Sequence, residues 1–144
     1  MEIFQVDEKG RLFISPEIDD WQPLEECGIS VVIDLDGGMD IGIPTIPNQL
    51  LYIYFPIDDI RALPDLEKMH AVARLGASLV ERGYTVLSHC GMGFNRSALM
   101  AGVILTYLGV PGEEAAALIR QRRPGALFNK QFACYLQSLS SVPV

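Results

Sequence analysis

Apolar residues in the chain gather in short runs that are separated by clusters of Gly, Pro and Asp. Runs rich in β-branched or aromatic residues predict strands. The predicted strands span residues 3–6, 12–15, 29–35, 50–57 and 84–88. The first two are separated by a turn-rich stretch and are expected to form a hairpin. The run at 29–35 is nearly continuous in apolar character, which is typical of a strand covered on both faces.

Between and after these strands, the chain shows helical spacing or helix boundary residues. The predicted helices span residues 16–26, 64–82, 97–108, 111–123 and a final stretch around 132–139. The stretch 97–108 is apolar on all sides, which indicates a helix buried within the domain. Because strands alternate with helices, we expect an α/β fold with a mostly parallel central sheet. In such sheets ligands bind at the carboxyl ends of the strands.

Length and composition favour one soluble domain spanning residues 1–144. The chain is 49% hydrophobic, yet no apolar run approaches the about 20 residues of a membrane-spanning helix, so we expect no membrane partner. The net charge of −7 disfavours stable nucleic-acid binding, which usually needs basic patches. The first residues lack the basic and apolar stretches of a secretory signal, so we expect a cytoplasmic protein. We also expect a monomer.

The cysteines and acidic residues do not indicate a disulfide framework or a metal site. Three widely spaced cysteines fit reduced thiols, and two histidines are too few for a zinc-ligand pattern. Asp34, Asp36 and Asp40 are interpreted as strand-end and turn carboxylates, because their spacing lacks the later ligands of an EF-hand.

One segment, His89-Cys90-Gly91-Met92-Gly93-Phe94-Asn95-Arg96-Ser97, follows the predicted strand at 84–88 and leads into the predicted helix at 97–108. A cysteine and an arginine six positions apart are weak evidence alone, since chance would give that spacing roughly one time in six. A phosphate-binding loop also requires a preceding strand, glycines in the spacer, a hydroxyl after the arginine and a helix beyond. All of these are present, so the segment predicts a phosphate-binding loop with a nucleophilic cysteine.

The chemistry predicted for this segment is attack by a thiolate on phosphorus. A phosphoryl group would be bound by the backbone N–H groups of Gly91, Met92, Gly93, Phe94, Asn95 and Arg96. Gly91 and Gly93 let the backbone turn tightly, and the Arg96 side chain can bind two phosphoryl oxygens. The same positive field is expected to lower the pKa of Cys90, so that its thiolate forms a cysteinyl-phosphate intermediate at neutral pH.

The reaction also needs a proton donor and a partner for the sulfur. Asp58 and Asp59 follow the predicted strand at 50–57, and either could protonate the leaving oxygen. Ser97 could donate a hydrogen bond to the sulfur and make it a better leaving group when water hydrolyses the intermediate. His89 is either an ordinary core histidine or a residue that orients the loop and tunes the thiolate.

These residues resemble the cysteine-dependent protein tyrosine phosphatases, and the chain length fits the smaller dual-specificity branch. The resemblance covers about residues 29–136. It rests on His89-Cys90 through Arg96-Ser97, on Tyr54-Phe55-Pro56-Ile57-Asp58-Asp59, and on Ile119-Arg120-Gln121-Arg122-Arg123-Pro124-Gly125. It implies a phosphotyrosine phosphatase-like fold, with a sheet of about five strands flanked by helices, and no metal or other cofactor. It also implies that Asp59, three residues after the proline, is the general acid rather than Asp58.

The substrate stays open at this point. Phosphotyrosine in proteins is the leading expectation, with phosphoserine, phosphothreonine or a small phosphoester if the pocket is shallow. The stretch Gly93-Phe94-Asn95-Arg96 also resembles the loop of RNA 5′-triphosphatases of the same superfamily, so an RNA or nucleotide 5′-phosphate is the alternative. A catalytically silent module that binds phosphopeptides is a third hypothesis from another class.

Several other residues have simpler interpretations. Met92 and Phe94 are interpreted as rim or packing residues, and Asn95 as a partner of loop backbone groups. Cys27 and Cys134 are interpreted as packing residues, although either could pair with oxidised Cys90. His70 is expected at the surface. Three arginines at the end of the helix predicted at 111–123 are interpreted as a solvated helix end, and they are Arg120, Arg122 and Arg123. The alternative is a basic edge that steers anionic substrates.

Overall fold

A five-stranded sheet forms the centre of the molecule in the computed structural model, which describes residues 1–141. The strands are β1 (Phe4–Gln5), β2 (Leu12–Ser15), β3 (Ile29–Asp34), β4 (Leu51–Tyr54) and β5 (Thr85–His89). Their order across the sheet is β1-β2-β5-β3-β4. Strands β2, β5, β3 and β4 are parallel, and β1 pairs antiparallel with β2 as a hairpin. The α/β fold class with a mostly parallel sheet is therefore confirmed.

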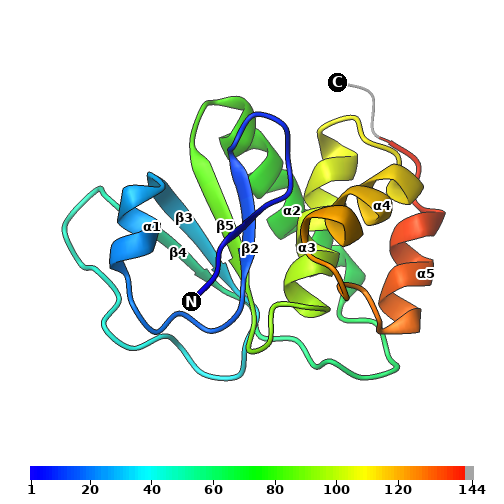
Figure 1. Cartoon of the computed structure of the whole chain (residues 1–144), viewed down its shortest axis with the longest axis horizontal. Coiled ribbons are helices and arrows are strands. Elements are labelled where there is room, and N and C mark those ends of the chain that lie inside the picture. The colour runs from blue at the N-terminus through cyan, green and yellow to red at the C-terminus, as the bar shows by residue number, and fades with distance from the viewer. Residues whose placement is uncertain (142–144) are drawn as a thin grey trace.

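Helices cover both faces of the sheet, as Figure 1 shows. They are α1 (Gln22–Glu26), α2 (Leu66–Glu81), α3 (Arg96–Tyr107), α4 (Gly112–Arg122) and α5 (Lys130–Ser138). The larger hydrophobic cluster joins the sheet to α2, α3, α4 and α5, and a smaller cluster around Leu24 of α1 covers the other face. This arrangement buries β3 on both faces, as its nearly continuous apolar sequence predicts.

Helix α3 lies in the interior of the molecule and follows the carboxyl end of β5. All its residues from Ser97 to Thr106 are buried, which confirms the prediction of a buried helix. It follows β5, a central strand, after a loop of only six residues. The loop is therefore anchored by rigid elements at both ends.

Several predicted elements are shorter than the sequence indicates, and for two of them the structure shows where the chain goes instead. The helix predicted at 16–26 begins only at Gln22, because the preceding residues run beside the loop after β5, where the N–H of Glu17 donates to the carbonyl of Gly91 (3.1 Å). Pro23 then occupies the first turn of α1, where a missing N–H costs nothing. The regular part of the strand predicted at 50–57 ends at Tyr54, although the N–H of Ile57 still donates to the carbonyl of Leu35.

A polar network joins α2, α3 and α5. His70 was predicted at the surface, but it is half-buried, and its ring nitrogens lie 2.7 Å from the Tyr107 hydroxyl and 2.6 Å from the Tyr135 hydroxyl. Burial lowers the pKa of His70, and the charge of Arg74 lowers it further.

No helix among residues 1–141 is long and apolar enough to cross a bilayer.

Candidate active site

The loop between β5 and α3, residues 90–95, forms the predicted phosphate-binding loop, and we call it the cradle loop. It begins where β5 ends at His89, and α3 begins at Arg96. The N–H of Cys90 donates to the carbonyl of Ser15 on β2 (3.3 Å), which ties the loop to the neighbouring strand. The strand, loop and helix therefore have the order that the sequence predicts, with the loop at the carboxyl end of the sheet.

Cys90 is buried, and its sulfur is faced by two groups among residues 1–141. The N–H of Gly93 donates to Sγ at 3.3 Å, and the Ser97 hydroxyl oxygen lies 3.3 Å from Sγ. Gly93 has a positive φ of 75°, so its N–H turns back towards the cysteine three residues earlier. A thiolate at this position would accept a hydrogen bond from each of these groups.

Arg96 is the first residue of α3, and its guanidinium lies at the edge of the cradle loop. Its Nη1 is 3.3 Å from the Asp36 carboxylate and 3.4 Å from the carbonyl oxygen of Ile57. A Cβ added at Gly91 would lie 3.3 Å from Nη2, so the side chain bends back over the loop. Its Nε is buried without a hydrogen-bond partner among the described residues, which leaves a donor for a ligand.

The two candidate acids point to different places. Asp59 is bound to the cradle loop, because one carboxylate oxygen accepts from Nδ2 of Asn95 (2.9 Å) and the other accepts from Nδ2 of Asn129 (2.7 Å). Asp58 instead lines a cavity beside Arg96. The geometry thus brings Asp59, the acid implied by the family resemblance, into contact with the loop that carries Cys90.

Asn129 is a residue that sequence reasoning missed. Its own N–H donates to Oδ1 of Asn95 (2.9 Å), and its side chain also bonds the Ile60 carbonyl (2.9 Å). It is the N-cap of α5, where its Oδ1 accepts from the N–H of Phe132. An asparagine before a helix predicts a cap. Nothing in the sequence indicates its second role as a link between Asp59 and the cradle loop.

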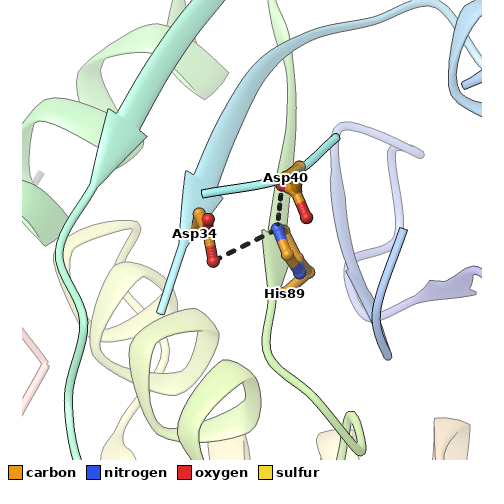
Figure 2. Close-up of side chains that lie close together, drawn as sticks. All are labelled: Asp34, Asp40 and His89. Carbon is orange, nitrogen blue, oxygen red and sulfur yellow. Dashed lines mark hydrogen bonds and ion pairs between the residues drawn. The ribbon is translucent and has the colours of Figure 1, made fainter. Parts of the chain in front are cut away.

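The carboxylates of Asp34 and Asp40 both lie close to one ring nitrogen of His89, the residue before Cys90 (Figure 2). Nε2 of the fully buried histidine is 2.7 Å from Oδ2 of Asp40 and 3.4 Å from Oδ1 of Asp34. The Tyr52 hydroxyl contacts both carboxylates. Burial raises the pKa of Asp34 and also raises the pKa of Tyr52. Asp34 and Asp40, interpreted from the sequence as strand-end and turn carboxylates, therefore form a hydrogen-bond network with His89.

The rim beyond Gly93 is built by arginines of the α4 end. The Arg123 guanidinium carbon lies 3.9 Å from the centre of the Phe94 ring and 4.5 Å from that of Phe4. Arg120 donates to the carbonyl of Leu127 (3.0 Å). Arg120 and Arg122 are exposed in the last turn of α4, which fits the interpretation of a solvated helix end, whereas the half-buried Arg123 packs against the rim.

The other two cysteines, Cys27 and Cys134, are exposed, whereas Cys90 is buried. Their interpretation as packing residues is therefore wrong. Cys27 lies at the end of α1, and Cys134 lies on α5.

Comparisons with known proteins identify the family. Residues 9–110 match the family described as "Polymorphic toxin system, DSP-PTPase phosphatase". No curated protein matches the sequence at a significant level.

Similar solved structures have the same fold over nearly the whole chain. Human DUSP28 is 19% identical, with 94% of this chain and 90% of that chain covered and a TM-score of 0.81. The human tyrosine phosphatase-like serine/threonine/tyrosine-interacting protein is 21% identical, with 94% and 93% covered and a TM-score of 0.75. Tk-PTP in its active form is 25% identical, with 93% and 95% covered and a TM-score of 0.71. With its β5–loop–α3 unit and its family match, the chain belongs to the dual-specificity branch of the cysteine-dependent phosphatases, in the DSP-PTPase phosphatase family of polymorphic toxin systems.

Proposed function

We propose that the protein hydrolyses phosphate monoesters through a cysteinyl-phosphate intermediate, with phosphotyrosine in proteins as its main substrate and phosphoserine or phosphothreonine as further substrates. The observation that carries the proposal is the surroundings of the Cys90 sulfur. The N–H of Gly93 and the hydroxyl of Ser97 each lie 3.3 Å from it, at the N-terminus of a buried helix. Such donors stabilise a thiolate, and a helix N-terminus favours a bound phosphoryl group.

In the first step, the Cys90 thiolate attacks phosphorus. The S–P bond forms, the P–O bond to the leaving group breaks, and Asp59 in its acid form gives its proton to the leaving oxygen. The cradle-loop amides and Arg96 bind the phosphoryl oxygens while charge spreads over them. Asn95 and Asn129 hold the Asp59 carboxyl at the cradle loop, whereas Asp58 lines the cavity beside Arg96, so the choice of Asp59 as the acid rests on the family resemblance.

In the second step, water attacks phosphorus and the Asp59 carboxylate accepts its proton. The S–P bond breaks, inorganic phosphate leaves, and the electron pair returns to the Cys90 sulfur. Ser97 stabilises the departing thiolate by donating its hydroxyl hydrogen, for which the 3.3 Å separation is suitable. Each residue thereby returns to its starting state.

The cavity beside Arg96 favours a single phosphoryl group on an apolar leaving group. It has a volume of about 640 Å³, and its apolar lining includes Phe55, Ile60 and Leu63. Its charged lining consists of Asp36, Asp58, Asp65, Lys68 and Arg96. Three carboxylates against two cations would repel the additional phosphates of a triphosphate, whereas an aromatic ring fits apolar walls.

The two residues that suggested an RNA 5′-phosphate substrate make contacts within the protein. Phe94 packs against Arg123, and Asn95 binds Asp59 and Asn129. These contacts account for Phe94 and Asn95 without an RNA ligand. They support the phosphotyrosine proposal over the nucleotide alternative.

The proposal is tested by phosphate release from p-nitrophenyl phosphate, a phosphotyrosine peptide and a triphosphate-ended oligonucleotide. We expect turnover of the first two by the unsubstituted protein and by Cys134→Ser, the matched control at an exposed cysteine. Cys90→Ser is expected to lose all turnover. Equal phosphate release by Cys90→Ser and the unsubstituted protein would refute the mechanism. Preference for the oligonucleotide would refute the substrate, and tight phosphopeptide binding without turnover would indicate a silent binding module.

A further inference from the structure

A short acidic segment after β3 touches both ends of the cradle loop. This segment, residues 36–40, is called the clasp segment below. Its Asp36 lies 3.3 Å from Arg96, which follows the loop, and its Asp40 lies 2.7 Å from His89, which precedes it. The N–H of Asp40 donates to the Tyr52 hydroxyl on the edge strand β4 (3.0 Å). The clasp segment therefore bridges β4 and the two residues that flank the cradle loop.

The Tyr52 hydroxyl joins both carboxylates of the cluster at His89. It donates to Oδ2 of Asp34, and its oxygen lies 2.9 Å from Oδ2 of Asp40. Asp34 also accepts from the N–H of Asp36 (2.9 Å), and burial raises the pKa of Asp34. Asp34 therefore has hydrogen-bond donors other than His89.

Asp40 is the carboxylate of this cluster that faces His89 directly. The 2.7 Å separation is a hydrogen bond, whereas the 3.4 Å separation between His89 and Asp34 is too long for a strong one. Nδ1 of His89 is buried without a hydrogen-bond partner among residues 1–141. The groups that face the polar edge of the ring are therefore Asp40 from the clasp segment and Asp34 from β3, with Tyr52 of β4 behind them.

We propose that Asp40 is a positioning residue for the nucleophile, because it accepts the Nε2–H hydrogen of His89 and so fixes the ring and the start of the cradle loop. The cradle loop contains the N–H of Gly93 that donates to the Cys90 sulfur (3.3 Å). Without the Asp40 contact, the ring of His89 is no longer held in one orientation next to Cys90, and the Gly93 N–H is less well aligned with the sulfur. The effect on turnover rests on the proposed function, whereas the effect on Cys90 reactivity does not.

The test measures alkylation of Cys90 by iodoacetamide as a function of pH. Cys27→Ser and Cys134→Ser form the background, so that Cys90 is the reacting thiol. In this background, Asp40→Ala is expected to move the midpoint of the profile upwards by about one pH unit, which is about tenfold slower alkylation below both midpoints. Asp40→Asn keeps an acceptor oxygen for His89 and is expected to restore most of the reactivity. Asp19→Ala, at an exposed carboxylate, is the matched control.

The outcomes separate this proposal from the proposed function. An unchanged Asp40→Ala profile would overturn the positioning role. A shift to lower pH would also overturn it, because Asp40 would then act on Cys90 through its charge. A shifted profile in a protein without phosphatase activity would leave the positioning role intact and contradict only the proposed function. If activity is present, Asp40→Ala should lower kcat more than it changes KM.

A measurement on the unsubstituted protein guards against variants that fail to fold. Nitrogen-15 NMR of the imidazole groups reports which ring nitrogen of His89 carries hydrogen, and His70→Gln assigns the two histidines. We expect hydrogen on Nε2 of His89, bonded to Asp40. A bare Nε2 at neutral pH would overturn the proposal, because Asp40 would then have no hydrogen to accept.

Discussion

Replacement of Gly93 by alanine tests the backbone geometry that brings an N–H to the Cys90 sulfur. Gly93 has a φ of +75°, and an added Cβ would lie 2.7 Å from the backbone nitrogen of Pro16 and 3.0 Å from the carbonyl carbon of Ser15. The left-handed conformation costs an L-residue about 1–2 kcal/mol. Overpacking against backbone that cannot move aside costs about 1–3 kcal/mol more. We therefore expect Gly93→Ala to lower the free energy of unfolding by about 2–5 kcal/mol.

Gly28 provides a matched control for this substitution. Its φ is +73°, almost that of Gly93, but nothing lies within 4 Å of an added Cβ. Gly28→Ala should therefore cost only the conformational part, about 1–2 kcal/mol. Urea unfolding of both variants isolates the steric part as the difference between them. Equal losses in the two variants would refute the argument that the cradle loop is packed against Ser15 and Pro16.

Four further substitutions address the chemistry and the pH dependence. Asp59→Asn should lower kcat for a phosphotyrosine peptide about 10²–10⁴-fold, and Asp58→Asn should lower it far less, as steady-state kinetics would report; the reverse order would transfer the acid role to Asp58. Ser97→Ala should slow hydrolysis of the intermediate about tenfold, since a hydrogen bond to a charged group contributes about 1.5 kcal/mol, and a pre-steady-state burst should then be visible. Burial lowers the pKa of His70 in the folded protein. As pH falls through the usual histidine value of about 6.5, the unfolded chain therefore takes up a proton on His70 before the folded protein does, and the free energy of unfolding decreases. His70→Gln should flatten the change of the urea midpoint between about pH 7.5 and pH 5.5, and identical slopes in both proteins would contradict this assignment.

The sequence predicts those parts of the fold that depend on local patterns. Continuous β-branched runs predict β3 and β5, and the apolar stretch that becomes α3 predicts a buried helix. The close approach of Cys90 and Ser97 follows from the same local unit, because a strand, a short loop and a helix leave few alternative geometries. What is local in sequence is therefore largely predictable.

The missed parts depend on contacts between segments far apart in the sequence. Asp34 meets His89 because the parallel register of β3 and β5 pairs these two residues, and register is not visible in either strand alone. Asn129 reaches Asp59 across a separation of 70 residues. The stretch before α1 leaves its predicted helix because Glu17 bonds Gly91. In each case a tertiary contact outweighs the local preference.

The central claim is that Cys90 forms a covalent bond to phosphorus during turnover. The most direct test is acid quenching of the protein during hydrolysis of an aryl phosphate, followed by mass spectrometry of the peptide that contains residues 89–97. We expect a phosphoryl group on Cys90, with more of it in Ser97→Ala, where the second step is slower. Phosphate release without any adduct on Cys90, or an adduct on another residue, would contradict it.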